Sequence, residues 1–322
     1  MQDSKSAFNK QKTIQTVGFF TLLAVILAVL NLVFDPLRRD MLEYVSERDN
    51  YYLSLLQEPE DTVDILAMGD SLSYGMIDTI DFWEQEGYTS HIVGQAGQVV
   101  PETYYELKKL MKTQSPKLVI IETHIMIYEP ITELYETEKQ FLYSTIPVTK
   151  YHELWKVMLG KKDSVMRPHF KGFEMRGNVY PYSGEEYMQD TGETRRIGGF
   201  SRFYMKKLKK LCDENGAELL LVSLPSPSNY SYATHKGFAE LAEELQVSYI
   251  DMNLMIGELD IDWTKDMLDG PDHLNYGGTK KVSAYLRAYI KEHYDIESRT
   301  DDERVRDWNE QAEKYKKCAG IP

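Results

Sequence analysis

The most regular feature of the chain is a short apolar run followed by a longer stretch with helical spacing, repeated from residue 62 onwards. The apolar runs predict buried strands at 63–69, 89–96, 117–123, 217–223 and 247–252. The helical stretches follow at 77–86, 102–113, 201–215, 235–245 and 279–293, with Gly216 expected at the end of the third. Strands and helices that alternate in this way favour an α/β domain whose parallel sheet is covered on both faces.

This alternation of strands and helices is interrupted between residues 125 and 198. The interruption is rich in aromatic residues, prolines and glycines, so we predict an insertion with some helix near 150–159. Trp155, Tyr180 and Tyr182 are candidates for a sugar-facing wall, although packing in a core is the commoner role of such side chains.

The most apolar stretch lies near the N-terminus. Residues 17–34 have the sequence VGFFTLLAVILAVLNLVF, and a helix of about 18 residues is just long enough to cross a hydrocarbon core. Lys5, Lys10 and Lys12 precede it, which favours a cytoplasmic location for residues 1–16. We therefore predict a single-pass protein of the cell membrane, with the bulk of the chain outside the cytoplasm. A cleaved signal peptide and a buried helix of a soluble protein are the alternatives.

Two segments flank the predicted domain at 62–292. Residues 35–61 predict a polar helical stalk with a partial apolar stripe, which we interpret as a spacer. Residues 293–322 form a charged, helix-prone tail that is either packed or loose.

Composition narrows the possible functions. The chain of 322 residues is long enough for one main core with additions. Its formal net charge of −14 argues against sequence-independent binding to nucleic acid or anionic lipid, since both depend on clustered Lys and Arg. Cys212 and Cys318 are too few for a disulfide framework or a cysteine zinc site. No metal motif is present, and we predict neither a metal nor a cofactor.

Candidate chemistry is concentrated in two stretches about 200 residues apart. Gly69-Asp70-Ser71 directly follows the first apolar run, and Asp269-Gly270-Pro271-Asp272-His273 precedes the last helix. Both lie at the carboxyl edge of the predicted sheet, where open α/β sheets place their active sites. A serine becomes nucleophilic when a histidine oriented by a carboxylate removes its proton. The alternative is that Ser71 only caps a helix, that Asp272 or Asn275 caps the last helix, and that His273 is an exposed loop residue.

These blocks resemble those of the SGNH (GDSL) hydrolase superfamily over roughly residues 62–292. The closest resemblance is to its membrane-anchored, MBOAT-associated branch, which includes proteins similar to DltD and the PatB-type acetyltransferases. The resemblance implies a three-layer α/β/α fold with a flavodoxin-like parallel sheet, and Ser71 as the nucleophile with His273 as its base. It also implies a multi-pass MBOAT partner that hands acyl groups across the membrane.

The resemblance further implies an oxyanion hole, and two of the family's blocks are altered here. The backbone amides of Ser71 and Gly97 would supply two donors. His124 stands where the family's G-x-N-D block has its Asn, so its ring is the candidate third donor. The family's D-x-x-H aspartate is replaced by glycine. Asp269 is the favoured orienting carboxylate, because neighbouring side chains in an extended loop point to opposite sides, and Asp272 is the alternative.

Three functions follow. The first is transfer of an acyl group, expected to be acetyl, onto a cell-envelope polysaccharide through an acyl-serine. The second is an anchored esterase or deacetylase, which differs only in using water to release the acyl group. The third is a non-catalytic assembly subunit with a degenerate site.

Overall fold

The computed structural model describes residues 2–35, 41, 44–45, 47–128, 130–161, 168–184 and 186–320. The chain forms two compact units. One consists of Met1–Val45 and Phe141–Val165, and the other of Ser46–Gln140 and Met166–Pro322. The second unit contains the sheet and both blocks of candidate chemistry.

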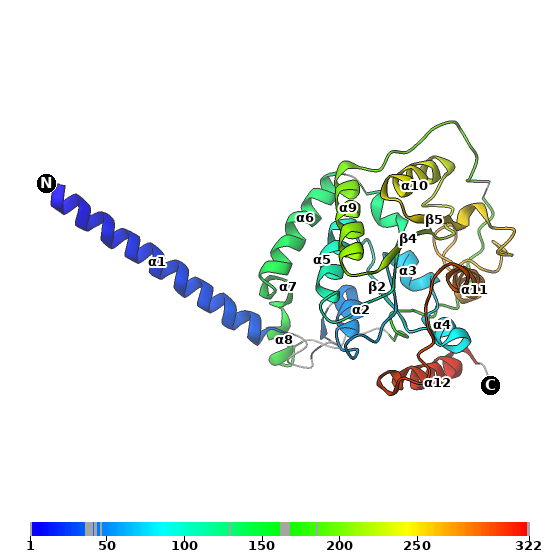
Figure 1. The fold of residues 1–322 in the computed structure, drawn as a ribbon, viewed down its shortest axis with the longest axis horizontal. Coiled ribbons are helices and arrows are strands. Elements are labelled where there is room, and N and C mark those ends of the chain that lie inside the picture. The colour runs from blue at the N-terminus through cyan, green and yellow to red at the C-terminus, as the bar shows by residue number, and fades with distance from the viewer. Residues whose placement is uncertain are drawn as a thin grey trace. The chain divides into compact units, whose positions relative to one another are not determined.

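The sheet has five parallel strands in the order β2-β1-β3-β4-β5. They are β1 (Ile65–Gly69), β2 (Ser90–Gly94), β3 (Leu118–Glu122), β4 (Glu218–Ser223) and β5 (Ser248–Asp251). Every residue of the three strands β1, β2 and β3 is buried. This double-sided burial explains why β1 and β3 appear in the sequence as nearly continuous apolar runs rather than as alternating ones. The strand order is the flavodoxin-like one, and the predicted parallel sheet with helices on both faces is confirmed (Figure 1).

Several helices of this unit lie around the strands. They are α3 (Ser71–Met76), α4 (Thr79–Glu86), α5 (Val100–Leu110), α9 (Gly199–Glu214), α10 (Tyr232–Leu245) and α11 (Tyr276–His293), with short 3₁₀ turns η2 (Thr123–Met126) and η3 (Met252–Leu254). α5 packs against α9, and α11 packs against α3 and α4. The helix predicted at 77–86 is present as α4. The short helix α3 that precedes it is separate, because Ile77 is extended and Asp78 caps α4 through the amides of Ile80 and Asp81.

The predicted stalk contains a helix that belongs to the core. α2 (Glu47–Leu55) packs against β2, and Tyr51, Leu53 and Leu55 are buried. Ser54 Oγ lies 3.3 Å from His91 Nε2 on β2. The interpretation of residues 47–55 as a spacer is therefore wrong: the stripe that looked partial in the sequence is one side of a helix packed on the sheet.

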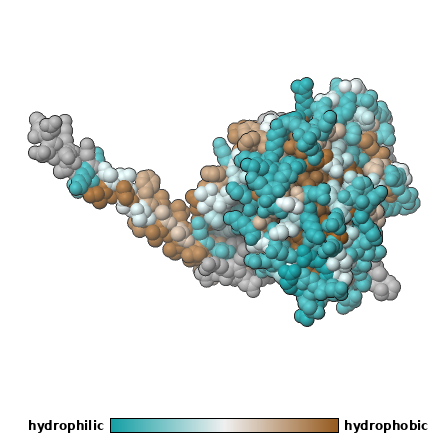
Figure 2. All heavy atoms as spheres, viewed as in Figure 1, coloured by the Kyte–Doolittle hydropathy of each residue, from teal (hydrophilic) through white to brown (hydrophobic). Residues whose placement is uncertain are grey.

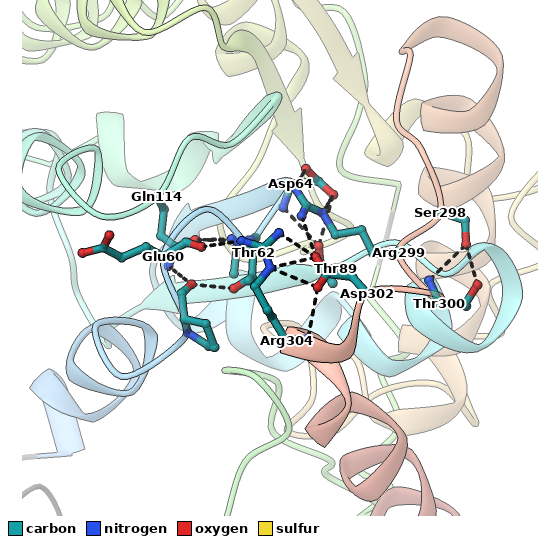
Figure 3. Close-up of polar contacts among 12 residues, drawn as sticks. Glu60, Thr62, Asp64, Thr89, Gln114, Ser298, Arg299, Thr300, Asp302 and Arg304 are labelled. Atoms are coloured by element: carbon teal, nitrogen blue, oxygen red, sulfur yellow. Dashed lines mark hydrogen bonds and ion pairs between the residues drawn. The ribbon is translucent and has the colours of Figure 1, made fainter.

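The charged tail is also packed. After η4 (Glu303–Val305), helix α12 (Asp307–Ala319) packs against α4, with Trp308 and Tyr315 fully buried. The connection to it is fixed by Arg299, which donates two hydrogen bonds of 2.5 and 2.7 Å to Asp64 just before β1 (Figure 3). An ion pair of this kind joins two segments that are 235 residues apart.

The region 125–198 contains more helix than its composition indicated. α6 (Pro130–Thr145) was not predicted, whereas the helix expected near 150–159 is present as α7 (Val148–Tyr151) and α8 (Leu154–Met158). The boundary between the two units falls within α6.

The first unit begins with a long helix, α1 (Gln2–Val33), which contacts α7. Its residues Lys10–Val33 are long and apolar enough to cross a membrane, and none of the most apolar window is buried. Figure 2 shows this apolar surface along the helix. A membrane anchor and a signal sequence both have this character.

Candidate active site

Ser71 lies at the junction of β1 and α3. Gly69 ends the strand, Asp70 caps the helix by accepting a 3.0 Å hydrogen bond from the amide of Leu72, and Ser71 is the first helical residue. A Cβ at position 69 would lie 2.6 Å from Cβ of Glu122, so the packing of β1 on β3 admits only glycine there. The Gly-Asp-Ser block thus ends the strand, caps the helix and presents Ser71 at the carboxyl edge of the sheet.

His273 reaches this edge from a loop that folds back on itself. Met267 and Leu274 form an antiparallel bridge, and the amide of Leu268 donates to the carbonyl of His273 at 2.8 Å. Gly270 turns the chain with φ of +80°. The loop places Nε2 of His273 2.8 Å from Oγ of Ser71, although the two residues are 202 positions apart. The structure therefore brings the two predicted catalytic residues into hydrogen-bond contact.

Both candidate carboxylates lie near this histidine, but they differ in geometry. Nδ1 of His273 is 2.8 Å from Oδ2 of Asp269, and the His273 amide donates to the other Asp269 oxygen at 2.8 Å. Asp272 is 3.4 Å from the same Nδ1, and its Oδ1 accepts a 2.5 Å hydrogen bond from Asn229. Both carboxylates are a little under half exposed. Asp269 is therefore the better-placed orienting group, and the turn at Gly270 compensates for its position one residue earlier than in a D-x-x-H block.

The residues expected to form an oxyanion hole come from the ends of three adjacent strands. Ser71 follows β1, Gly97 follows β2, and His124 follows β3 in η2. As the first residue of α3, Ser71 has an amide with no acceptor in its own helix. Gly97 is exposed in a turn closed by the 2.8 Å hydrogen bond from Gln98 to Gln95, and its φ of +66° favours glycine.

The ring of His124 is held by Asp70, the residue before Ser71. Its Nδ1 is hydrogen-bonded to Oδ2 of Asp70, while the other oxygen of that carboxylate caps α3. Burial by itself would lower the pKa of His124. The hydrogen bond to Asp70 and the negative charge of Asp70 outweigh burial and raise this pKa above its usual value. The environment therefore favours an imidazolium, in which Nε2 is also a hydrogen-bond donor.

Two contributors to the site were missed from the sequence. Glu122 is fully buried beneath His124, where it accepts a 3.1 Å hydrogen bond from the His124 amide and another from the Tyr230 hydroxyl. Burial and then the nearby charge of Asp70 raise the pKa of Glu122 to about 8. The signal for it was a carboxylate at the end of a strand, next to His124. Arg176 donates to the Ser71 carbonyl at 3.3 Å, and nothing in the sequence connects it to position 71.

A metal has one candidate location among the described residues. Asp269, Asp272 and His273 place three potential ligand atoms within 4.8 Å of one another. Both ring nitrogens of His273 already have partners in this structure, since Nε2 is directed at Ser71 and Nδ1 at Asp269.

Comparisons with known proteins give matches in structure only. No protein-family model matches the chain, and no curated protein matches its sequence. A GDSL-like lipase from Bacteroides thetaiotaomicron is 13% identical with a TM-score of 0.41, over 76% of this chain and 97% of that one. The psychrotrophic esterase EstA from Pseudoalteromonas sp. is 14% identical with a TM-score of 0.38, and the match covers 72% of this chain and 98% of that one. A lipase/acylhydrolase from Enterococcus faecalis is 13% identical with a TM-score of 0.38, over 74% and 99%. These values support no conclusion about catalysis, which depends on the side chains described above.

Proposed function

We propose that this protein is a membrane-anchored serine acyltransferase that acts outside the cytoplasm. It moves an acyl group, most simply acetyl, onto a cell-envelope polysaccharide through an acyl-serine intermediate. The observation that carries the proposal is the hydrogen-bonded series from Ser71 Oγ to His273 Nε2 and from His273 Nδ1 to Asp269, each contact 2.8 Å long.

In the first half-reaction, Oγ of Ser71 attacks the acyl carbonyl while His273 Nε2 takes the hydroxyl proton. Asp269 holds the imidazole with its Nδ1 proton directed at the carboxylate and stabilises the imidazolium that forms. The imidazolium then gives its proton to the leaving group, and the acyl group remains on Ser71. Asp272 contributes a second negative charge 3.4 Å from the same ring nitrogen.

The negative charge that develops on the carbonyl oxygen needs fixed donors. The amides of Ser71 and Gly97 and the Nε2 proton of His124 are the proposed set. Each well-placed donor contributes on the order of 3 kcal/mol to transition-state stabilisation. His124 would act as a charged donor in place of an asparagine amide, with Asp70 fixing its ring.

In the second half-reaction, the acceptor separates a transferase from an esterase. A sugar hydroxyl, deprotonated by His273, attacks the acyl-serine and takes the acyl group, and His273 then gives its proton to the departing Oγ of Ser71. Water in the same position would give a deacetylase, which is the alternative function. The apolar helix at Lys10–Val33 favours transfer, since an anchored enzyme meets a membrane-presented donor and a surface polymer at high local concentration. The proposed donor-side partner is a multi-pass MBOAT protein, and the proposed topology has a cytoplasmic N-terminus.

The test is acceptor dependence in the full-length protein. The protein is incubated with an acetyl ester donor and candidate envelope glycans, and both acetylated glycan and free acetate are measured by mass spectrometry. Acetylated glycan that is lost in Ser71→Ala supports transfer, and acetate alone supports hydrolysis. A fluorophosphonate probe that fails to label Ser71 in the folded protein would leave the non-catalytic subunit as the remaining function.

A further inference from the structure

The unit built from α1 and Phe141–Val165 carries an apolar surface that the proposed chemistry does not use. Trp155, Met158 and Leu159 have i, i+3, i+4 spacing and therefore share one side of α8 and its end. Their exposed fractions are 43%, 44% and 61%. The buried side of the same segment is formed by Val148, Tyr151 and Leu154. Residues 148–159, called the interfacial segment below, thus have one packed side and one exposed apolar side.

This segment is tied to the carboxyl end of the apolar helix. Pro147, the residue that precedes α7, supplies no side-chain cap, and Oδ1 of Asn31 instead accepts a 2.7 Å hydrogen bond from the amide of Val148. Asn31 is one of the few polar residues in the apolar run, and it lies two positions before the end of α1. The 24 residues from Lys10 to Val33 span about 36 Å at 1.5 Å per residue, slightly more than a hydrocarbon core. A helix that crosses the bilayer therefore brings Asn31, and with it Val148, to the membrane surface.

The local charge differs from that of the whole chain. Residues 141–161 contain Lys150, Lys156 and Lys161 against a single acidic residue, Glu153, whereas the chain as a whole has a net charge of −14. Nζ of Lys150 lies 5.8 Å from the ring centroids of both Tyr143 and Tyr151. Aromatic rings with lysines beside an apolar side are typical of helices that lie in the membrane interface. The overall charge still disfavours anionic lipid, so the apolar side chains are the main source of affinity.

We propose that the interfacial segment lies in the headgroup region of the bilayer, with Trp155, Met158 and Leu159 inserted between the acyl chains. The occupant of this apolar surface is lipid, because the segment is held at the end of the membrane helix by the Asn31 hydrogen bond. The inference rests on the proposed role of α1 as an anchor. It adds a second, monotopic membrane contact to the single span.

The experiment uses fluorescence quenching in vesicles. Full-length protein is reconstituted into vesicles of phosphatidylcholine and phosphatidylglycerol, with or without lipids brominated near the headgroup end of the acyl chain. The chain has four tryptophans, so the emission of wild type minus Trp155→Phe isolates Trp155. Lipid insertion predicts a short-wavelength emission maximum for Trp155 and loss of most of its emission in brominated vesicles.

Two double variants show whether the apolar side is responsible. Met158→Ser/Leu159→Ser keeps Trp155 as the reporter and should shift its emission to longer wavelength and weaken the quenching. Val179→Ser/Leu254→Ser removes two exposed apolar side chains of the other unit and should leave the quenching unchanged. Equal quenching in both double variants would overturn the assignment of the contact to this side of α8.

Failure of the inference is distinguishable from failure of the anchor. Resistance to alkaline carbonate extraction measures the anchor in the same samples, and Ser71-dependent ester hydrolysis measures the proposed catalysis. Protein that resists extraction while Trp155 stays unquenched overturns the inference and leaves the anchor intact. Extraction of the protein by alkaline carbonate would overturn both the anchor and the inference. Trp155 that is unquenched in pure lipid but shielded from acrylamide in native membranes identifies a protein partner as the occupant instead.

Discussion

Replacement of Asp269 by asparagine tests the geometry of the site most directly. The substitution is nearly isosteric, and the side-chain oxygen can still accept the 2.8 Å hydrogen bond from the His273 amide. The NH₂ group of the asparagine then replaces Oδ2 of Asp269, 2.8 Å from Nδ1 of His273, which must itself donate a hydrogen bond. Two donors cannot face each other, so His273 is driven to the tautomer with its proton on Nε2. That tautomer cannot accept the proton of Ser71.

The expected loss follows from this tautomer change. An Asp→Asn change that traps the wrong imidazole tautomer in a serine triad lowers kcat about ten-thousandfold, which corresponds to about 5 kcal/mol of transition-state stabilisation. Asp272, 3.4 Å from the same nitrogen, can supply part of the lost charge, so we expect a loss of about a thousandfold or more with little change in KM. Asp272→Asn should cost less than about tenfold, since half-exposed charges are screened.

The assay is the initial rate of p-nitrophenyl acetate hydrolysis by full-length protein in detergent, with Ser71→Ala as the blank. Circular dichroism and thermal unfolding of both variants serve as controls for folding. A larger loss in Asp272→Asn than in Asp269→Asn would refute the assignment of Asp269 as the orienting carboxylate. Equal activity of Asp269→Asn and wild type would refute the triad itself.

Three further predictions follow from the same structure. The imidazolium of His124 is lost as pH rises through its raised pKa, so wild-type kcat should fall on the alkaline side of the pH–rate profile. His124→Asn should remove this alkaline decrease. His124→Ala should lower kcat about a hundredfold to a thousandfold, and pH–rate profiles of all three proteins measure both effects. Arg299→Ala leaves the buried Asp64 without its arginine partner and should lower the free energy of urea unfolding by about 3 kcal/mol. Arg304→Ala, at a more exposed position, should lower it by less than about 1 kcal/mol. Similar losses in the two variants would contradict a special contribution of the buried pair Arg299–Asp64. Burial raises the pKa of Asp78 to about 6, so the folded state binds the proton more tightly and stability falls as pH rises from about 4 through 6. The free energy of unfolding of Asp78→Asn should match that of wild type near pH 4 and exceed it by about 3 kcal/mol near pH 8. Thermal melts of the two proteins without this pH dependence would exclude the effect.

The sequence was sufficient for the elements with strong local signals. Apolar runs identified all five strands, most clearly β1, β3 and β4, because a strand buried on both faces contains few polar residues. The Gly-Asp-Ser block and the loop with His273 could be paired in advance because parallel strands bring their carboxyl ends to one edge. The choice of Asp269 over Asp272 was favoured by an alternation argument, but the structure reaches the same geometry through the turn at Gly270.

Other features were hidden because their signals are not local. α2 was taken for a stalk, since the side of the helix that packs on β2 includes Asn50 and tyrosines rather than a clean apolar stripe. Arg176 and Arg299 look like ordinary charged residues, and their contacts with Ser71 and Asp64 join positions 105 and 235 residues apart.

What the sequence determined by itself was the set of strands, the apolar helix, and the identity of a serine, a histidine and their carboxylates at one edge of a sheet, because periodicity and strand direction fix these locally. What only the tertiary structure decided was which carboxylate faces the histidine, what charge surrounds His124, and which segments close the core. These depend on distances of a few ångströms between residues far apart in the chain, and no local pattern of residues encodes such distances.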